Sequence, residues 1–536
     1  MNVSTRPPFP ERRPDPSLAR SYAKAGLWTS AVLGDVLGSA LATRPAGEAA
    51  TDERGSWTYA ELDASARRVA AGLAAMGVTA GDVVLWQVPN CREVLSLLIA
   101  CWQLGAVAAP VVEVYREHEL RQIIAAVAPT VVASVVEHRG FQHAELFDDL
   151  LHDVDLPAKK LLVDGERVGW TSWSELPDGG PGPGADVAPT SPSLLLFTSG
   201  TTAAPKVVVH THRSLLAEAR QVTTVMGWTA DDVSYVATPL AHVSGLLRGV
   251  LAPLSAGGAV RTRQRWDPQL VVDDLGAGDV SILGVPGIGT RSALLGELLD
   301  VIERGGTPPR SVRLLVATGP RADLERAEAL GLHPGQHYGM SELPTITVVN
   351  PSDPFDQRVD TAGRVAPGVD LRVVDGPGSI VPAGTHGEIE VRGPEQMSGY
   401  LSADDDRAAW TDDGWLRTGD IGAVDGAGYV SITGRTKDII NRGGEKFSAL
   451  EIEEQLARHP AVSEAAVVPV EDRRLGEVPA AFVVLRDGRS ASAADTELAR
   501  HLVESGLARQ KVPVRWEFVD HLPRTASGKV KKGELH

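Results

Sequence analysis

Hydrophobic and polar positions repeat with two different periods along this chain. In the first third, and again over 207–350, short apolar stretches typical of buried strands alternate with amphipathic segments of helical period. Thr58 precedes the first amphipathic segment and Glu61 follows three residues later, which predicts a capped helix from Thr58 through Met76. Strands and helices that alternate in this way form a doubly wound, mostly parallel sheet.

The pattern changes after about residue 360. Short alternating strands between Gly, Pro and Asp turns indicate a small antiparallel or barrel-like unit, and a compact α+β pattern follows it. We therefore expect an α/β protein with a large N-terminal domain of doubly wound sheets plus a small β unit, and a small α+β C-terminal domain. The predicted bounds are a flexible arm over 1–25, the N-terminal domain over 26–436 and the C-terminal domain over 437–536.

The composition limits the class of protein. A chain of 536 residues, 43% of them hydrophobic, can bury a substantial core in more than one domain. It has no membrane-spanning apolar stretch and no signal-peptide pattern, so we expect a cytoplasmic protein without a membrane partner. Cys91 and Cys101 lie in an apolar region, which favours buried thiols over a disulfide or a zinc site.

The charge is unevenly distributed. A net charge of −17 argues against general nucleic-acid binding. Six of the ten lysines nevertheless fall in the last hundred residues. This bias indicates either a solvated face or a module that brings positive charge to an anionic ligand.

Residues 198–206, Thr-Ser-Gly-Thr-Thr-Ala-Ala-Pro-Lys, directly follow the apolar run 194–197. A strand that leads into hydroxyls, a glycine and a lysine suits polyphosphate binding, because backbone N–H groups, hydroxyls and the ammonium can all donate to phosphate oxygens. The spacing is not that of a Walker loop. A surface turn rich in Ser, Thr and Gly would give the same pattern, so the other motifs decide between the two.

Four further motifs follow in order. Residues 338–342, Tyr-Gly-Met-Ser-Glu, offer an aromatic plane, a glycine, a hydroxyl and a carboxylate, which suit adenine, phosphate and Mg²⁺. Residues 417–420 end in a carboxylate that can accept from ribose hydroxyls, or serve as a plain turn. Residues 434–445 suit a charged hinge or a linker turn. Residues 523–529 end in a lysine that is either catalytic or simply solvated.

Together and in this order, the motifs resemble those of the adenylate-forming superfamily of acyl- and aryl-CoA ligases, nonribosomal adenylation domains and firefly-type luciferases. The resemblance covers roughly 30–536. It is strong to medium-chain acyl-CoA and cyclohexanecarboxylate-CoA ligases, on the basis of Tyr-Arg-Glu-His-Glu-Leu at 115–120, Pro-Leu-Ala-His-Val-Ser-Gly at 239–245 and Arg-Gly-Gly-Glu at 442–445. It implies an active site between the large domain and a C-terminal domain that acts as a mobile lid.

The resemblance also implies roles for individual residues. Lys529 would serve the adenylation step, His242 would gate the acyl pocket, and Glu342 would act at the phosphates and hold Mg²⁺. Lys437 would be the hinge, with Gly443 and Gly444 along the path of the acceptor. The implied ATP-binding residues are Thr198, Ser199, Gly200, Thr201, Thr202, Lys206, Thr318, Gly319, Pro320, Tyr338, Gly339, Ser341, Asp420 and Arg435.

The candidate acyl pocket is apolar. It shows no lysine or arginine to pair a second charge and no acidic residue for an ammonium group, so we expect an apolar monocarboxylic acid rather than an amino acid. The same residues could instead fill core. The pocket candidates are His242, Val243, Gly245, Val285, Pro286, Gly287, Met340 and Leu343.

The implied reaction is ATP-dependent activation of the acid to an acyl-adenylate with release of pyrophosphate, followed by transfer to the thiol of CoA with release of AMP. The cofactors would be ATP and Mg²⁺, with CoA as co-substrate, in a monomer or homodimer. An amide synthetase that transfers the acyl group to an amine or amino acid, and an enzyme that loads a carrier protein, are the alternatives. A non-catalytic binding protein is disfavoured, because Lys529, Glu342 and Asp420 are all present.

Three positions depart from the family pattern. Ala203 and Val207 stand where relatives usually carry glycine, and Ser341 replaces the usual threonine. The hydroxyl of Ser341 preserves the chemistry. Val207 is β-branched and suits a strand better than a mobile loop, so we expect nucleotide binding to survive while loop mobility and turnover are altered.

Overall fold

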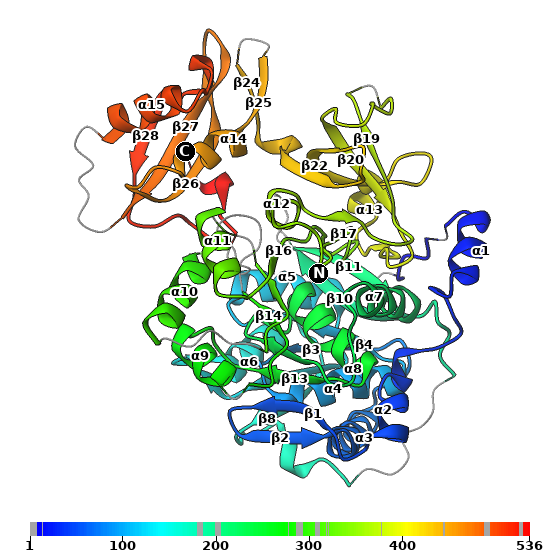
Figure 1. Cartoon of the computed structure of the whole chain (residues 1–536). Coiled ribbons are helices and arrows are strands. Elements are labelled where there is room, and N and C mark those ends of the chain that lie inside the picture. The colour runs from blue at the N-terminus through cyan, green and yellow to red at the C-terminus, as the bar shows by residue number, and fades with distance from the viewer. Residues whose placement is uncertain are drawn as a thin grey trace.

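The computed structural model describes residues 8–12, 14–178, 186–198, 205–276, 278–285, 293–305, 311–317, 319, 321–376, 378–442, 445–486, 494–524 and 529–535. The large domain contains two main sheets, and the small domain lies at one end of the molecule beside a separate antiparallel sheet (Figure 1). This is the α/β architecture expected from the sequence. Among the described residues, no helix combines the length and apolarity needed to cross a membrane.

The first main sheet carries the predicted phosphate motif. Its strand order is β21-β11-β10-β4-β3-β5-β8-β9. The strands from β10 to β9 run parallel, whereas β11 is antiparallel to both β10 and β21. Its strands are β3 (Val83–Gln87), β4 (Val107–Pro110), β5 (Val131–Val135), β8 (Lys159–Asp164), β9 (Thr171–Ser172), β10 (Pro192–Thr198), β11 (Lys206–Thr211) and β21 (Gly399–Tyr400).

The second main sheet supplies one side of the cavity that holds the predicted acyl pocket. Its strand order is β16-β15-β14-β12-β13-β1-β2, parallel throughout except for the β1–β2 hairpin. Its strands are β1 (Glu48–Asp52), β2 (Gly55–Thr58), β12 (Val233–Val236), β13 (Ala259–Thr262), β14 (Ile282–Gly284), β15 (Leu314–Val316) and β16 (Pro334–Gly335). Two short antiparallel pairs, β6 (Glu137–His138) with β7 (Phe141–Gln142) and β17 (Thr347–Val348) with β18 (Arg364–Val365), stand apart from it.

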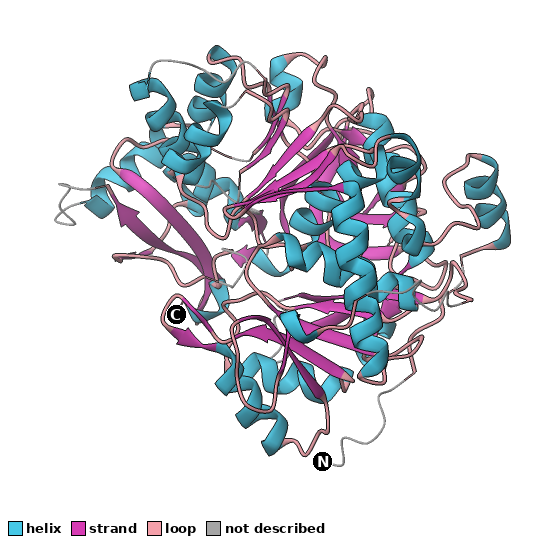
Figure 2. Cartoon of the chain, turned by 90° about the horizontal axis from the view of Figure 1, so that it is seen from below, coloured by secondary structure: helices cyan, strands magenta, loops and turns pink. Residues whose placement is uncertain are grey.

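Helices lie between and around these sheets (Figure 2). The predicted helix after Thr58 is confirmed, since Thr58 and Glu61 form a capping box at the start of α3. The α-helices are α1 (Pro16–Lys24), α2 (Gly38–Thr43), α3 (Tyr59–Ala75), α4 (Arg92–Leu104), α5 (Glu117–Val127), α6 (His143–Asp153), α7 (His212–Val225), α8 (Ala252–Ala256), α9 (Pro268–Gly276), α10 (Ala293–Gly305), α11 (Arg321–Ala329), α12 (Phe355–Asp360), α13 (Ala403–Ala409), α14 (Ala449–Leu456) and α15 (Ala494–Glu504).

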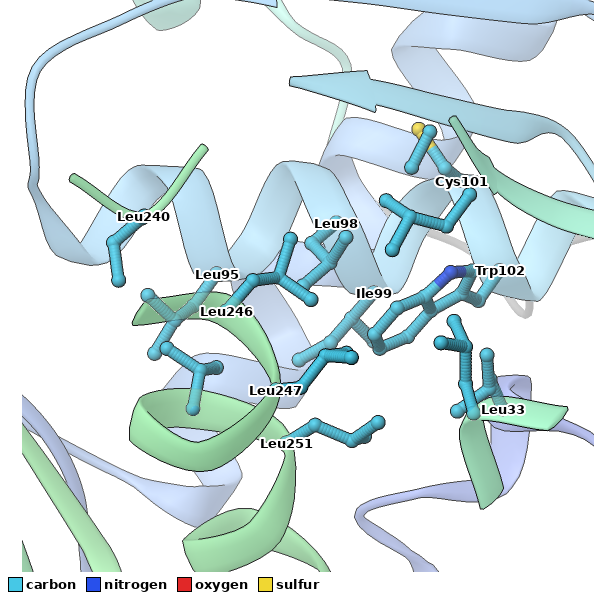
Figure 3. Close-up of a cluster of buried hydrophobic side chains, with 14 of the residues drawn as sticks. Leu33, Leu95, Leu98, Ile99, Cys101, Trp102, Leu240, Leu246, Leu247 and Leu251 are labelled. Carbon is cyan, nitrogen blue, oxygen red and sulfur yellow. The ribbon is translucent and has the colours of Figure 1, made fainter. Parts of the chain in front are cut away.

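The core joins α4 to a π-helix, η3 (Ser244–Leu251), that follows the predicted acyl-pocket motif. Leucines on η3 face Leu95, Leu98, Ile99 and Trp102 of α4 (Figure 3). Burying each large apolar side chain contributes roughly 1.5–3 kcal/mol. The apolar face of η3 therefore anchors this helix in the core, and its other residues can line the predicted pocket. Both cysteines lie in this region as free, buried thiols, as expected.

Part of the predicted flexible arm is a helix. Asp15 accepts a hydrogen bond from the backbone N–H of Ser17 at 2.7 Å and so caps α1. Tyr22 on this helix is buried and meets Trp28 edge to face, with ring centroids 5.1 Å apart. Trp28 in turn donates from Nε1 to the carbonyl oxygen of Pro394 at 2.9 Å, which ties this segment to the body of the protein.

The predicted small β unit is a four-stranded antiparallel sheet in the order β19-β20-β22-β23. The turn η4 (Thr436–Asp438) follows it and leads into the C-terminal sheet, where α14 and α15 pack. The strands are β19 (Asp370–Val374), β20 (Gly387–Arg392), β22 (Leu416–Val424), β23 (Val430–Arg435), β24 (Ile439–Arg442), β25 (Glu445–Ser448), β26 (Val462–Asp472), β27 (Gly476–Leu485) and β28 (Arg515–Phe518).

Candidate active site

The predicted phosphate motif connects two antiparallel strands. Thr198 ends β10, Lys206 begins β11, and the two residues lie directly opposite each other in the sheet. The Nζ of Lys206 lies 2.8 Å from Asp405 Oδ1 and 5.1 Å from the centroid of the Tyr400 ring. The ammonium is therefore held at the mouth of the hairpin by a carboxylate and an aromatic face.

The carboxylate of Glu342 contacts Tyr400, the aromatic residue beside Lys206. The Tyr400 hydroxyl donates a hydrogen bond to Glu342 Oε1. Burial raises the pKa of Glu342, while this hydrogen bond and the charges of Lys529 and Arg435 act in the opposite direction. Tyr400 thus contacts both the predicted phosphate-binding lysine and the predicted metal-binding carboxylate.

The segment that carries Glu342 is fixed by its surroundings. Burial lowers the pKa of His210 to about 4, so the ring is neutral, and its Nε2 donates to the carbonyl oxygen of Ser341 at 2.7 Å. A Cβ on Gly339 would lie 2.0 Å from the carbonyl oxygen of Pro344, so only glycine fits there. The close approach at Gly339 and the histidine contact hold this loop against β11.

Three predicted nucleotide residues meet at Asp420. This carboxylate is 4% exposed and sits on β22, opposite Arg435 on β23. The Tyr338 hydroxyl donates to Asp420 Oδ2 at 2.7 Å, and Arg435 Nε donates to Oδ1 at 2.7 Å. Burial and the nearby Asp420 raise the pKa of Tyr338 well above its usual range, so the phenol keeps its proton. The cluster offers an aromatic ring beside a charged acceptor.

Lys529 reaches the same region from the small domain. Its backbone is positioned by a bridge between Arg524 and Val530 and by a 2.7 Å hydrogen bond from the Lys531 N–H to the Pro523 carbonyl. The charge of Lys529 contributes to lowering the pKa of His242 and opposes the upward shift of Glu342. Its ammonium therefore lies within electrostatic range of both side chains.

A cavity of about 170 Å³ lies beside His242, between η3 and the strands of the second main sheet. Of the predicted pocket residues, His242, Val243, Gly245 and Val285 line it. Met340 and Leu343 lie outside the lining. Leu343 is fully buried in the large core and Met340 packs against that core, because the two residues bridge to each other across a tight turn.

The cavity contains charge and polarity that the sequence analysis did not expect. Arg248, on η3, is part of the lining, as is His337, two residues after β16 ends. Burial lowers the pKa of Arg248, and the nearby Glu218 acts against this. Burial, followed by the charge of Arg248, lowers the pKa of His337 to about 3. The expectation of a pocket without lysine or arginine is corrected by Arg248.

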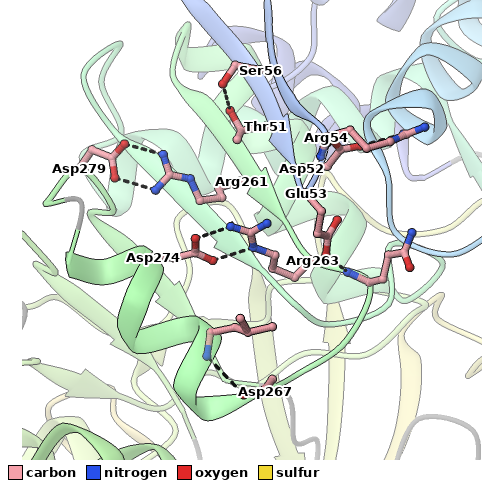
Figure 4. Close-up of polar contacts among 12 residues, drawn as sticks. Thr51, Asp52, Glu53, Arg54, Ser56, Arg261, Arg263, Asp267, Asp274 and Asp279 are labelled. Atoms are coloured by element: carbon pink, nitrogen blue, oxygen red, sulfur yellow. Dashed lines mark hydrogen bonds and ion pairs between the residues drawn. The ribbon is translucent and has the colours of Figure 1, made fainter. Parts of the chain in front are cut away.

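Asn90 holds the loop that presents His242. Its Nδ2 donates to the carbonyl oxygens of Thr238 at 2.9 Å and Arg263 at 3.1 Å, and its Oδ1 accepts from the Leu240 N–H at 2.8 Å. Arg263 is itself fixed by a two-pronged contact with Asp274 (Figure 4). Burial lowers the pKa of His242 to about 3, so a neutral imidazole faces the cavity.

The remaining predicted site residues fall partly inside and partly outside the described part of the chain. Gly319 is described, and a Cβ there would lie 3.1 Å from Leu295 Cδ2. The backbone of Lys437 lies in the turn between the two C-terminal sheets. The residues that lie outside the described part of the chain are Ser199, Gly200, Thr201, Thr202, Pro286, Gly287, Thr318, Pro320, Gly443 and Gly444.

Sequence reasoning missed five residues that shape the site: Asn90, His210, Arg248, His337 and Tyr400. Four of them act through contacts between segments far apart in the chain, so no local pattern marks them. Arg248 carried a weak signal, because it is a charge within the apolar stretch 245–254.

The donor set limits what metal the site could hold. Among the described residues, no group of three or more His, Cys, Asp or Glu side chains could bind a metal ion. Glu342 supplies a single carboxylate. Mg²⁺ is usually held by one or two carboxylates together with substrate phosphates and water. The residues therefore fit an ion that is bound jointly with a nucleotide, and they do not fit a protein-only metal cage.

Comparison with known proteins agrees with this geometry. Residues 39–401 match the AMP-binding enzyme family, and 451–529 match the AMP-binding enzyme C-terminal domain. The chain is 30% identical to the medium-chain fatty-acid–CoA ligase of Escherichia coli (96% of this chain, 91% of that protein) and 33% identical to a salicyl-AMP ligase / salicyl-S-ArCP synthetase of Mycobacterium tuberculosis (98% and 93%).

A solved structure extends the likeness to the whole fold. ATP-bound MatB from Rhodopseudomonas palustris superposes with a TM-score of 0.83 at 28% identity, over 95% of this chain and 98% of MatB. Since both family matches fall on the two domains whose residues meet at the site, the chain belongs to the AMP-binding enzyme family and is an ATP-using, AMP-forming carboxylic acid ligase.

Proposed function

We propose that this enzyme converts a carboxylic acid to its acyl-adenylate at the cavity beside His242 and then transfers the acyl group to CoA. The observation that supports the proposal is that Gly339, which lines the cavity, directly follows Tyr338, whose hydroxyl donates to Asp420 in the predicted nucleotide cluster. The charge of Lys529, on the small domain, also acts on the pKa of His242 at the cavity and of Glu342. A carboxylate and an α-phosphate that meet between these two side chains would both face the ammonium.

The adenylation step needs neutralisation of like charges. One oxygen of the substrate carboxylate attacks the α-phosphorus of ATP, and the bond from that phosphorus to the bridging oxygen of the β-phosphate breaks. Pyrophosphate leaves with the electron pair. Lys529 offsets the negative charge of the carboxylate and the α-phosphate as they approach, and Lys206 with Thr198 faces the leaving phosphates.

The nucleoside would be held at the Asp420 cluster. Each oxygen of Asp420 accepts one hydrogen bond from the protein, and a carboxylate oxygen has capacity for another, so both can accept from ribose hydroxyls. The ring of Tyr338 would stack against adenine. Glu342 would hold Mg²⁺, which balances the charge of the leaving pyrophosphate when bound.

The second step releases AMP. The sulfur of the acceptor thiol attacks the carbonyl carbon of the adenylate, the bond from that carbon to the phosphate oxygen breaks, and the thiol proton passes to solvent. Lys529 is not needed for this step. We propose that the small domain rotates about Lys437 between the steps, which removes Lys529 and brings the segment at Gly443 and Gly444 to the thiol path.

CoA is favoured as the acceptor by the likeness to a fatty-acid–CoA ligase. A carrier protein is the second candidate, since the salicyl-S-ArCP synthetase of Mycobacterium tuberculosis is similar over nearly the whole chain. An amine acceptor would use the same adenylation residues. The three candidate functions therefore share the adenylation step and differ only in the acceptor of the second step.

Mass spectrometry of the products tests the function. ATP, Mg²⁺ and a panel of cyclic, aryl and aliphatic acids would be incubated with CoA, with a phosphopantetheinylated carrier protein, or with a mixture of amines. We expect AMP, pyrophosphate and an acyl-CoA thioester. Acylated carrier protein without acyl-CoA would move the chain to the carrier-loading enzymes. Enzyme-dependent amide, above a control fed only the adenylate, would make it an amide synthetase.

A further inference from the structure

Arg248 places a guanidinium in the wall of the cavity beside His242. It lies on η3 between Leu247 and Gly249, both of which are buried. The side chain of Arg248 keeps some exposed surface and lines the cavity. Its place in the lining puts part of this side chain at the cavity wall.

The guanidinium lacks a partner within the described part of the chain: it makes no hydrogen bond or ion pair there. The carboxyl that acts on it is Glu218 on α7, and the Thr345 hydroxyl already donates to one oxygen of that group at 2.7 Å. Burial raises the pKa of Glu218 to about 7, so at neutral pH this group is only partly ionised. Glu218 therefore does not fully balance the cation.

Other polar atoms on the cavity wall are also unsatisfied. Among the described residues, neither ring nitrogen of His337 has a hydrogen-bond partner, although the backbone of Thr347 lies near, and the Nε1 of Trp228 has none either. A buried polar group without a partner is costly, and a buried cation without an anion is more so. A ligand with hydrogen-bond acceptors and negative charge would satisfy these groups of the cavity wall.

We propose that the acid bound in this cavity carries a second acidic group, and that Arg248 pairs with that group while His337 hydrogen-bonds beside it. The proposal rests on the function proposed above and names its substrate class. The planar fork of an arginine matches a carboxylate with two parallel hydrogen bonds. A neutral ester accepts such hydrogen bonds more weakly because it carries no charge. The first carboxylate would remain at His242 and Lys529 for adenylation.

Pyrophosphate release from matched substrates tests the proposal. A panel of aliphatic and aromatic diacids would each be compared with its monomethyl ester, which keeps the skeleton and one reactive carboxyl. For at least one pair we expect kcat/KM to be ten-fold or more higher for the diacid. In R248Q the preference should vanish or invert, and in R248K it should be reduced. The exposed Arg407 offers the control R407Q, which should keep the wild-type preference.

The ratio of two substrates in one enzyme preparation does not depend on how much of the protein is folded, so a destabilised variant still gives a valid result. Wild-type enzyme that uses every ester as well as its diacid, or R248Q with the wild-type ratio, would overturn the proposal while leaving the ligase function intact. Absence of pyrophosphate with every acid tried, including simple monocarboxylic acids, would instead overturn the proposed function and this inference with it.

Discussion

The Asp420 side chain contacts two other residues of the predicted nucleotide site. It is buried, it lies on β22, and it receives hydrogen bonds from Tyr338 and Arg435. Without the carboxylate, the Arg435 cation would lose its anion and the Tyr338 hydroxyl would lose its acceptor. At the residue scale, therefore, one substitution should disturb the ribose contact and the adenine platform together.

We expect Asp420→Ala to raise the Kd for ATP by ten-fold or more, which corresponds to about 1.4 kcal/mol. Isothermal titration of ATP, without acid, gives the value directly. Asp420→Asn should have an intermediate effect, because the amide keeps an acceptor oxygen and loses the charge. The exposed Asp404 gives the matched control, since Asp404→Ala should leave the Kd unchanged. An unaltered Kd in Asp420→Ala would contradict the ribose assignment.

Asn90 holds the loop before His242, beside the proposed acyl pocket, through three hydrogen bonds to backbone groups. Asn90→Ala would leave those groups unsatisfied, so we expect the free energy of unfolding to fall by about 1–3 kcal/mol. The KM for the acid should rise while the Kd for ATP stays unchanged, because the loop before His242 would lose its anchor. Chemical denaturation and steady-state kinetics measure the two effects. An increase in the ATP Kd that matches the increase in acid KM would argue against a local role.

At the scale of elements, the β10–β11 hairpin explains one departure from the family pattern. Val207 lies opposite Phe197 within the sheet and is 6% exposed. It packs in the core on that face of the first main sheet. The β-branched residue therefore belongs to the strand, as its preference predicts.

Val207→Gly should accordingly act on stability. Loss of a buried apolar side chain and added backbone freedom in a strand should lower the free energy of unfolding by about 2–4 kcal/mol. We expect no gain in turnover at a temperature where both proteins are folded. Denaturant unfolding and pyrophosphate release measure the two quantities. Faster turnover at unchanged stability would show that the valine restrains the phosphate loop.

Local signals predicted the elements that depend on neighbours in sequence. The capping box at Thr58 and Glu61 set the start of α3, and the apolar run before Thr198 set β10. The π-helix η3 had no such signal, because its sequence is equally suited to an α-helix. The approach of Arg248 to His337 joins η3 to the end of β16, and only the tertiary fold determines that contact.

At the scale of the whole molecule, the lysine bias of the small domain has a structural account. Lys511 pairs with Glu451, Lys531 with Glu534, and Lys532 with Glu453 and Asp438. These pairs lie within the C-terminal part of the chain. Lys529 differs from them, because its charge acts on Glu342 and His242 of the large domain. Among the described lysines of the small domain, some are thus paired within it, while the charge of Lys529 also acts on groups of the large domain.

The most direct test of this account separates the two half-reactions in Lys529→Ala. The rate of adenylate formation, measured as pyrophosphate released from ATP in the presence of the acid, should fall by about 10²-fold or more. Thioester formation from synthetic acyl-adenylate and CoA should remain close to the wild-type rate, and Lys531→Ala should leave both rates unchanged. Equal loss of both half-reactions in Lys529→Ala would contradict a role confined to adenylation.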